Sequence, residues 1–324
     1  MIAVSVIVPF HNAESTLGAA LESLLSQQCR EEVEFILVND GSTDHSEELV
    51  KYFFALHPEF EKKSILINSP FRQGVAAAYS LGLNNASGEY LARLDSDDTL
   101  SSNAIDIMLT TARTEGADIV CGKIKKIYPG KSSKICSPSS LFGNLNCMPL
   151  NTTNFSLCNK LVRKSLLFNN DIFPTAGIDC WDDVSIMSRA FSVSSKSIAI
   201  SQSVYNYTID IRNASLSNTP HELTMRQRLM CCLLVEKWFV ERGTADKFEE
   251  FILLMKFHAK IKLLRGDYCD IKKWRDTYPE VNNNNIMKIK QLPWIMRTGF
   301  YILDKLPLIM GKTICKTIDK FVKR

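Results

Sequence analysis

Three carboxylates stand within four residues at Asp95-Ser96-Asp97-Asp98, directly after the apolar run Tyr90–Leu94. Like charges this close repel one another unless a cation or hydrogen-bond donors offset them. Divalent ions such as Mg²⁺ take oxygen ligands, and one or two carboxylates commonly hold them together with substrate phosphates. The cluster therefore predicts a metal site that would stabilise a departing diphosphate. The structural alternative is that Asp98 or Ser101 caps the helix that follows.

Two further polar clusters could take part in chemistry. Asp40-Gly41-Ser42 follows the apolar run Val33–Val38, and the carboxylate of Asp40 could accept a hydrogen bond from a base N–H. Trp181-Asp182-Asp183 precedes a helical run, where a carboxylate could act as general base and take a proton from an acceptor hydroxyl. Turn formation and helix capping are the alternative interpretation of both clusters.

Other catalytic signatures are missing from the sequence. The histidines have no metal-binding spacing, and neither a G-x-S-x-G elbow nor a G-x-x-x-x-G-K-[ST] loop occurs. The first predicted strand is followed by no glycine until Gly18, so the dinucleotide-binding fingerprint is absent. Because no glycine-rich loop is present to bind it, a diphosphate would need a metal ion, and this favours the metal interpretation of Asp95–Asp98.

The elements that must position these clusters alternate along the first third of the chain. Predicted strands are Val4–Val8, Val33–Val38, Ser64–Ile67, Tyr90–Leu94 and Asp118–Cys121, and predicted helices are Ser15–Gln27, Asp44–Leu56, Gly74–Ala86 and Asn103–Glu115. This order predicts an open α/β sheet with right-handed crossovers. Ligands of such sheets bind at the carboxyl ends of the strands, where the polar residues after strands one, two and four fall. We therefore expect one site at that edge.

The later part of the chain follows a different pattern. Residues 122–155 are rich in Pro, Gly, Ser and Asn and predict a long excursion over the surface. Predicted helices Leu161–Phe168 and Asp183–Phe191 follow, then short strands Ser197–Ile200 and Val204–Thr208. From His221 onward only helical signals occur, in Leu223–Val240, Ala245–Leu264 and a basic end.

Composition and charge narrow the class of protein. The 324 residues are 45% apolar and 23% charged, which excludes a disordered chain, a fibre and a small disulfide scaffold. The net charge of +4 conceals a basic segment, because residues 256–324 carry +10 and residues 1–255 carry −6. This division argues against a nucleic-acid partner. Ten cysteines without a Cys-x-x-Cys pair, no signal peptide and no long apolar run predict an intracellular protein.

Four ordered motifs carry a resemblance to a known family. They are Val4-Ser5-Val6-Ile7-Val8-Pro9-Phe10-His11-Asn12-Ala13-Glu14, Val38-Asn39-Asp40-Gly41-Ser42-Thr43-Asp44, the run from Gly74 to Gly88-Glu89-Tyr90, and Asp95-Ser96-Asp97-Asp98. Together they resemble family 2 glycosyltransferases, with a weaker match through Asn159-Lys160-Leu161, Trp181-Asp182-Asp183 and 205–217. The resemblance implies a GT-A fold, a mostly parallel α/β sheet flanked by helices. It divides the chain into a catalytic domain at 1–218, with a nucleotide-sugar half at 1–121 and an acceptor half at 122–218, and a helical, basic region at 219–324.

The resemblance also implies roles for individual residues. The nucleotide would be contacted by Pro9, His11, Asn12, Glu14, Asp40, Arg72, Gly74, Asp95 and Ser96. Asp97, with Asp95, would hold Mn²⁺ or Mg²⁺, and Arg212 would lie near the diphosphate. Asp183 aligns with the catalytic base, but the family's Glu-Asp pair is Asp182-Asp183 here, which leaves open which carboxylate reaches the acceptor. The Asn common in the family's third motif is replaced around Arg72-Gln73, so contacts to the base are expected to differ.

The function that the resemblance implies is inverting, metal-assisted transfer of a sugar from a nucleotide diphosphate, typically a UDP-sugar, to a hydroxyl of a glycan or lipid-linked glycan, in bacterial surface polysaccharide synthesis. Two alternatives are a GT-A-like module that binds a nucleotide sugar without catalysis and a nucleotidyltransferase that releases pyrophosphate. The basic amphipathic segment 292–324 has three open interpretations: contact with an anionic membrane, a homodimer interface, or packing on the catalytic domain. We expect a cytoplasmic enzyme, with the membrane interpretation placing it at the inner face.

Overall fold

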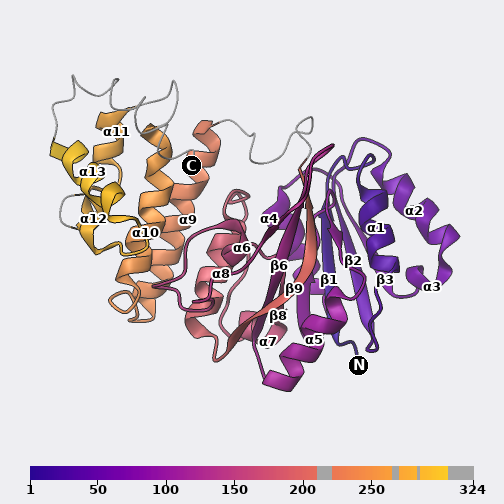
Figure 1. Ribbon diagram of the computed structural model, residues 1–324. Coiled ribbons are helices and arrows are strands. Elements are labelled where there is room, and N and C mark those ends of the chain that lie inside the picture. The colour runs from indigo at the N-terminus through magenta and orange to yellow at the C-terminus, as the bar shows by residue number, and fades with distance from the viewer. Residues whose placement is uncertain (210–220, 265–269, 283–284, 306–324) are drawn as a thin grey trace. The chain divides into compact units, whose positions relative to one another are not determined.

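The computed structural model describes residues 1–209, 221–264, 270–282 and 285–305 (Figure 1). The chain divides into two compact units, residues 1–143 with 151–217 and residues 144–150 with 218–324. Each unit is described by itself below. The predicted boundary at residue 218 lies outside the described residues and stays a prediction.

One mixed sheet of nine strands forms the centre of the first unit. The strands are β1 (Val4–Phe10), β2 (Val33–Asp40), β3 (Ser64–Ser69), β4 (Tyr90–Arg93), β5 (Thr99–Leu100), β6 (Ile119–Ile127), β7 (Lys134–Cys136), β8 (Lys160–Arg163) and β9 (Ser197–Thr208). Their order is β3-β2-β1-β4-β8-β6-β9-β5, with β7 paired to β6. Strands β1 to β4 are mutually parallel, whereas β8 lies antiparallel to both β4 and β6. The predicted α/β fold is therefore confirmed, and antiparallel pairs enter only in its second half.

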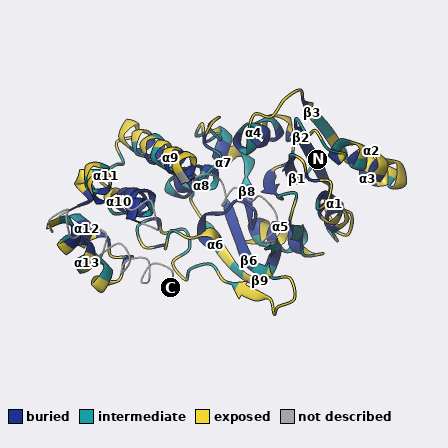
Figure 2. Ribbon diagram, turned by 90° about the horizontal axis from the view of Figure 1, so that it is seen from above, coloured by how far each residue is buried: buried dark blue, intermediate teal, exposed yellow. Residues whose placement is uncertain are grey.

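Helices cover both faces of this sheet (Figures 1 and 2). They are α1 (Leu17–Leu25), α2 (Ser46–Leu56), α3 (Pro58–Glu61), α4 (Val75–Asn85), α5 (Ala104–Glu115), α6 (Thr152–Phe155), α7 (Lys164–Phe168) and α8 (Asp182–Val193). The apolar sides of α1, α2 and α5 share one core with alternate residues of β1, such as Val6 and Val8. The residue between them, Ile7, faces α4, which approaches so closely that a Cβ on Gly82 would lie 2.3 Å from Ile7. The alternation of side chains along a strand thus divides β1 between two helix layers.

Three local predictions were wrong in the second half of the first unit. Residues 161–168 are not one helix, because 160–163 form strand β8 and only 164–168 are helical. The two strands predicted between 197 and 208 are the single strand β9, and the excursion at 122–155 contains the end of β6, β7 and α6. Pairing with strands distant in sequence decided the conformations of β8, β9 and the end of β6, and local periodicity does not report such pairing.

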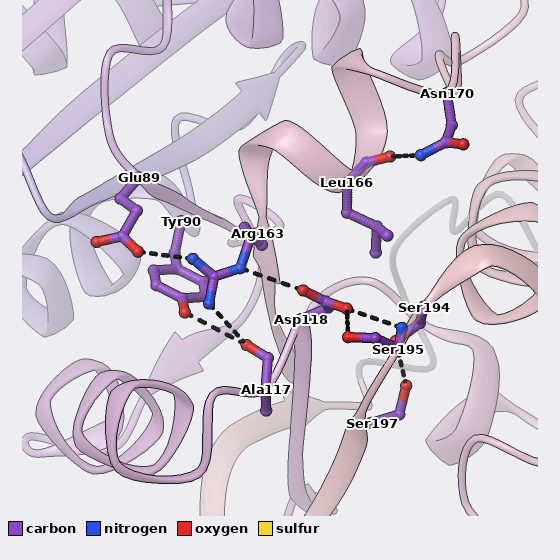
Figure 3. A network of polar contacts seen from close by, with 10 residues as sticks. All are labelled: Glu89, Tyr90, Ala117, Asp118, Arg163, Leu166, Asn170, Ser194, Ser195 and Ser197. Carbon is purple, nitrogen blue, oxygen red and sulfur yellow. Dashed lines mark hydrogen bonds and ion pairs between the residues drawn. The ribbon is translucent and has the colours of Figure 1, made fainter.

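A polar network joins strands at the edge of the sheet opposite the predicted site (Figure 3). The Arg163 guanidinium pairs with Glu89 at 2.8 Å and with Asp118 at 3.2 Å, and it lies 4.7 Å from the ring centre of Tyr90. Asp118 also accepts hydrogen bonds from the backbone and hydroxyl of Ser195. Because Tyr90 begins β4, Asp118 precedes β6 and Arg163 ends the antiparallel β8, this network joins the amino ends of β4 and β6.

The second unit is helical, as predicted. Its described elements are α9 (His221–Glu241), α10 (Glu249–Lys260), η2 (Ile261–Leu264), α11 (Ile271–Asp276), η4 (Pro279–Val281), α12 (Asn285–Lys288) and α13 (Trp294–Lys305). Its core surrounds Trp274, which is fully buried and packs against Phe300, and Phe300 in turn contacts the ring of Phe257. Within the part of the chain that the structure describes, no helix combines the length and apolar character needed to cross a bilayer.

Candidate active site

The loop after β1 is fixed to the loop after β2. Nδ1 of His11 donates to the backbone oxygen of Asp40 at 2.8 Å, and Oδ1 of Asn12 accepts the N–H of Thr43 at 2.8 Å. Oε2 of Glu14 accepts the N–H of His45 at 3.0 Å. The side chains of His11, Asn12 and Glu14 follow the buried Pro9 and are predicted to contact the nucleotide, and they hold the loops after β1 and β2 together.

The carboxylate of Asp40 holds a third loop beside the first two. Asp40 is 3% exposed, and its two oxygens accept the backbone N–H groups of Gln73 at 2.7 Å and Gly74 at 2.9 Å. Close approach requires glycine at Gly41, where a Cβ would lie 2.4 Å from the backbone of Phe71. Arg72 is exposed on this loop. The structure thus brings Asp40, Arg72 and Gly74 together at the carboxyl end of β2.

Asp95, the first carboxylate of the acidic cluster, is held from two sides. Its Oδ1 accepts a hydrogen bond from Nε of Arg93 at 2.8 Å, and its Oδ2 accepts one from Sγ of Cys158 at 2.9 Å. Arg93 ends β4 and is 6% exposed, whereas the side chain of Asp95 remains 31% exposed. The repulsion within the cluster is therefore offset in part by a buried arginine two residues earlier in the chain.

The other carboxylates of the cluster differ sharply in environment. Asp98 is 1% exposed and accepts hydrogen bonds from the hydroxyl of Tyr205 and the N–H of Thr208, both at 2.7 Å. Burial, followed by the charges of Asp95 and Asp97, raises the pKa of Asp98 to about 8. Asp97 is exposed. The geometry therefore makes Asp98 a structural link to β9 and leaves Asp97 accessible to a ligand, with the half-buried Ser96 between the flanking carboxylates.

These residues fit a metal that a substrate would share. Across the described ranges, no three His, Cys, Asp or Glu side chains gather as a complete ligand set. The accessible Asp97 and the partly exposed Asp95 offer carboxylate oxygens, the donor type that Mg²⁺ and Mn²⁺ take. Mg²⁺ is commonly bound by one or two carboxylates with substrate phosphates supplying further oxygens, so this donor set suits a diphosphate-bound ion.

The two carboxylates at the start of α8 have different partners. Asp182 is 6% exposed, and its Oδ2 pairs with Nη1 of Arg93 at 2.7 Å. Asp183 is half-buried, and its Oδ1 accepts the N–H of Val184 at 2.7 Å. Burial, and then the negative charge of Asp182, raises the pKa of Asp183 to about 7. Of the pair, Asp183 is therefore the carboxylate without the arginine ion pair and with a pKa suited to proton transfer near neutral pH.

Sequence reasoning missed three residues of this site. Arg93 joins Asp95 to Asp182, Cys158 contacts Asp95, and Oδ1 of Asp179 accepts the N–H of Ala76 at 3.0 Å, at the first turn of α4. Only Arg93 had a signal in the sequence, because a strand-end cation beside three carboxylates is expected to pair with them. The partners of the other two are 63 and 103 residues away. Predicted residue Arg212 lies outside the described residues.

This sheet and the site at its edge define a glycosyltransferase with the GT-A fold. S. aureus TarS 1–349 in complex with UDP-GlcNAc superposes with a TM-score of 0.72 at 17% identity, covering 98% of this chain and 92% of that one. The model of glycosyl transferase family 2 matches residues 5–168, so the chain belongs to this family. The resemblance of the four sequence motifs to family 2 glycosyltransferases is thereby confirmed.

Curated relatives agree with this assignment. A cholesterol galactosyltransferase of Borreliella burgdorferi is 25% identical over 336 residues, covering 90% of each chain. Glycosyltransferase GlyG of Streptococcus pneumoniae is 26% identical and covers 68% of this chain and 75% of that protein. The minor teichoic acid biosynthesis protein GgaA of Bacillus subtilis is 38% identical over 105 residues, covering 33% of this chain and 23% of that protein. The protein is therefore an enzyme of the glycosyltransferase class, as predicted.

Proposed function

We propose that this glycosyltransferase moves a sugar from a UDP-sugar to an acceptor hydroxyl in a single displacement that inverts the anomeric carbon. The observation that carries the proposal is one polar network, in which Arg93 connects Asp95 of the acidic cluster to Asp182, next to Asp183. Groups suited to a leaving diphosphate and to an attacking hydroxyl are thereby joined through buried contacts. The solved complex of TarS with UDP-GlcNAc supports a nucleotide-sugar donor.

Residues 1–121 supply the donor side in this proposal. The uracil would lie against Asp40 and the Arg72–Gly74 loop, and His11 and Asn12 would border it from the first loop. The spare lone pairs of the Asp40 carboxylate leave it able to accept a base N–H in addition to its two backbone donors. Asp95 and Ser96 would contact the ribose side of the nucleotide.

Asp97, with Asp95, would hold Mn²⁺ or Mg²⁺ against the diphosphate. When bound, the ion offsets the negative charge that develops on the leaving group. The same neutralisation relieves the repulsion among the three carboxylates at Asp95–Asp98. Arg212, placed near the diphosphate by the family resemblance, remains part of the proposal.

Asp183 is the general base of the proposed reaction. Its carboxylate takes the proton of the acceptor hydroxyl while the hydroxyl oxygen bonds to the anomeric carbon from the face opposite the diphosphate. The bond from that carbon to the diphosphate oxygen breaks, and UDP leaves with the bonding electrons. Asp182 is less suited to this role because the Arg93 ion pair stabilises its charge and its side chain is buried.

The acceptor in this proposal is a glycan or a lipid-linked glycan of the bacterial surface, bound by residues 122–218. Support comes from the relatives named for transfer to cholesterol and for teichoic acid biosynthesis. Helix α13 exposes Trp294 (67%), Ile295 (59%) and Ile302 (50%) in a segment that also carries Arg297 and Lys305. Apolar side chains bordered by cations suit an anionic membrane, and we propose that α13 attaches the enzyme to the inner face of one. Residues 306–324 lie outside the described residues.

A screen of nucleotide sugars tests the reaction itself. The full chain is incubated with each donor and Mn²⁺, and release of the nucleoside diphosphate is measured with and without EDTA. We expect turnover of a UDP-sugar that EDTA abolishes and that Asp97→Ala reduces by more than tenfold. Binding of UDP without turnover of any donor would favour a non-catalytic nucleotide-sugar-binding module, and release of pyrophosphate from a nucleoside triphosphate would favour a nucleotidyltransferase.

A further inference from the structure

The buried guanidinium of Arg93 occupies the junction between the two halves of the site. Nε donates to Asp95 at 2.8 Å and Nη1 donates to Asp182 at 2.7 Å, and the guanidinium carbon lies 5.3 Å from the ring centre of Tyr79. The planar fork of arginine can bond two carboxylates at fixed angles, which the single ammonium of lysine cannot reproduce. Strand β4 and helix α8, 89 residues apart in sequence, are thus joined by one side chain.

A second contact holds the segment that carries Asp183, the proposed catalytic base. Asp179, three residues before α8, accepts the N–H of Ala76 in the first turn of α4, and its carboxylate occupies the space that a Cβ on Gly74 would fill. The segment from Asp179 to Asp183 is therefore fixed at both ends to elements that border the proposed donor site. Trp181, between the two anchors, has a left-handed backbone with φ +74°, which sets the turn into α8.

We infer that Arg93 is a positioning residue that sets the place of the Asp183 carboxylate by fixing its neighbour Asp182 to Asp95. The inference rests on the proposed function, because it assigns Asp183 the role of base. Arg93 does not need to contact donor or acceptor in this role. Its charge compensates Asp182, and its fork geometry determines where α8 begins.

The charged groups that face Asp183 come from three elements. Asp182 lies beside it on α8, Arg93 approaches from β4, and the fully buried Lys160 approaches from β8. Asp182 raises the pKa of Asp183, whereas Arg93 and Lys160 lower it. Replacing Arg93 alone would also allow Asp182 to take up a proton. The charges of Arg93 and of Asp182 are therefore removed in separate variants and in a double variant.

The structure supplies a matched control for Arg93. Arg163 likewise pairs with two carboxylates, Glu89 and Asp118, and lies over a tyrosine ring, but at the opposite edge of the sheet (Figure 3). Loss of either arginine removes two ion pairs and a contact with a tyrosine ring, although the side chain of Arg163 is more exposed (27%) than that of Arg93 (7%). Only loss of Arg93 is expected to disturb the start of α8.

The kinetic test uses four variants of the network: Arg93→Lys, Arg93→Met, Asp182→Asn and the double variant Arg93→Met/Asp182→Asn. The controls are Arg163→Lys and Arg163→Met. We expect Arg93→Lys and Arg93→Met to lower kcat by about 10²-fold with the donor KM nearly unchanged, since misplacing a reacting group by about 1 Å costs that much. In the Asp182→Asn background, Arg93→Met should move the acid limb of the pH profile to higher pH, because a cation facing Asp183 is lost. The two Arg163 variants should keep kcat within a few-fold of the wild-type value and should not shift the acid limb of the pH profile.

A second measurement is independent of activity. Hydrogen exchange is followed at the backbone amides of Val184 and Ser185, which bond to Asp183 and Trp181 at the first turn of α8. Faster exchange there in Arg93→Lys, but not in Arg163→Lys, supports the inference even if the wild-type chain transfers no sugar and the proposed function fails. Unchanged exchange and a wild-type rate in Arg93→Lys would overturn it, whether or not Arg93→Met folds.

Discussion

Oδ2 of Asp40 accepts the backbone N–H of Gly74 at 2.9 Å, so the carboxyl end of β2 is joined directly to the start of α4. The contact requires glycine, because Gly74 has φ +99° and a Cβ there would lie 2.5 Å from the carboxylate of Asp179. One backbone position thus serves both the proposed base-binding aspartate and the segment that leads to the proposed catalytic base.

Gly74→Ala is therefore expected to damage both stability and nucleotide binding. Backbone strain at a position of positive φ and the clash with Asp179 together should cost about 2 kcal/mol or more of unfolding free energy. UDP affinity should fall at least several-fold, because Asp40 and its loop must shift. Chemical denaturation and calorimetric titration with UDP and Mn²⁺ measure the two effects.

Gly116→Ala is the matched control for this prediction. Gly116 also has positive φ, at +62°, but nothing lies within 4 Å of a Cβ placed there. In Gly116→Ala only backbone strain should lower the unfolding free energy, by about 1–2 kcal/mol, and UDP affinity should stay at the wild-type value. Equal UDP affinities for the two variants would show that the Asp40–Gly74 contact is irrelevant to nucleotide binding.

Asp183→Asn should retain UDP affinity and lose most sugar transfer. General-base catalysis typically contributes about 10²–10⁴-fold, and an amide cannot take the acceptor's proton. The control is Asp171→Asn, since Asp171 is exposed and asparagine tolerates its backbone at φ +54°. Transfer is measured at saturating donor and acceptor. A near-normal rate for Asp183→Asn would move the role of base to Asp182.

The wild-type enzyme should lose transfer activity as the pH falls through about 7. Burial and the charge of Asp182 raise the pKa of Asp183 to about 7, and the base acts only when deprotonated. Below that pH the rate should fall about tenfold per pH unit, and it should level off above it. A profile of kcat/KM between pH 5.5 and 8.5 tests this, and a rate independent of pH down to 5.5 would exclude Asp183 as the titrating base.

Stability of the helical unit should rise with pH near neutrality because of Lys260. Its ammonium is fully buried, donates to Oδ1 of Asn282 at 2.8 Å and lies 4.4 Å from the ring centre of Trp274. Burial lowers the pKa of Lys260 to about 7, so above pH 7 the folded chain binds fewer protons than the unfolded chain, and the unfolding free energy increases with pH. The increase is about 1.4 kcal/mol per pH unit.

The increase in unfolding free energy should end at about pH 8.5. There the thiols of the unfolded chain begin to lose protons, whereas burial raises the pKa of Cys232 in the folded chain and keeps its thiol protonated. Urea denaturation followed by tryptophan fluorescence suits the measurement, because three of the four tryptophans (Trp238, Trp274 and Trp294) belong to this unit. Lys260→Met should abolish the slope, and Lys237→Met, at an exposed position on α9, should keep it. A slope that persists in Lys260→Met would contradict the assignment.

Helix α13 should bind anionic vesicles through its exposed apolar side chains. The full chain is expected to sediment with vesicles that contain anionic lipid at low salt, less so at high salt, and not with zwitterionic vesicles. Deletion of 292–324 should abolish binding. The double variant Trp294→Ser/Ile295→Ser should lower the bound fraction roughly tenfold or more, since each buried apolar side chain contributes about 1.5–3 kcal/mol.

The control is Leu233→Ser, which removes a side chain of similar exposure (57%) from α9. It should leave vesicle binding unchanged. No vesicle binding at low salt, together with a dimeric mass in sedimentation that the α13 variant lowers to a monomer, would assign this face to a second copy of the chain instead.

The amino-acid sequence alone predicted the parallel half of the sheet and the edge that carries the site. Apolar runs that end in polar residues at His11, Asp40 and Asp95 are local signals, and parallel pairing places their carboxyl ends together. The four family motifs carried the same information, and the comparisons confirmed the family. Local periodicity failed for β8 and β9, whose conformations depend on partners distant in sequence.

Only the tertiary structure separated the roles of neighbouring carboxylates. Asp97 and Asp98, like Asp182 and Asp183, are chemically identical neighbours in sequence, and their difference arises from burial and from partners on other elements. Tyr205 and Thr208 on β9 secure Asp98, and Arg93 on β4 secures Asp182. Charge, solvent exposure and pKa depend on distances between segments that the chain brings together only when it folds, which is why a motif could name the acidic residues without assigning each its task.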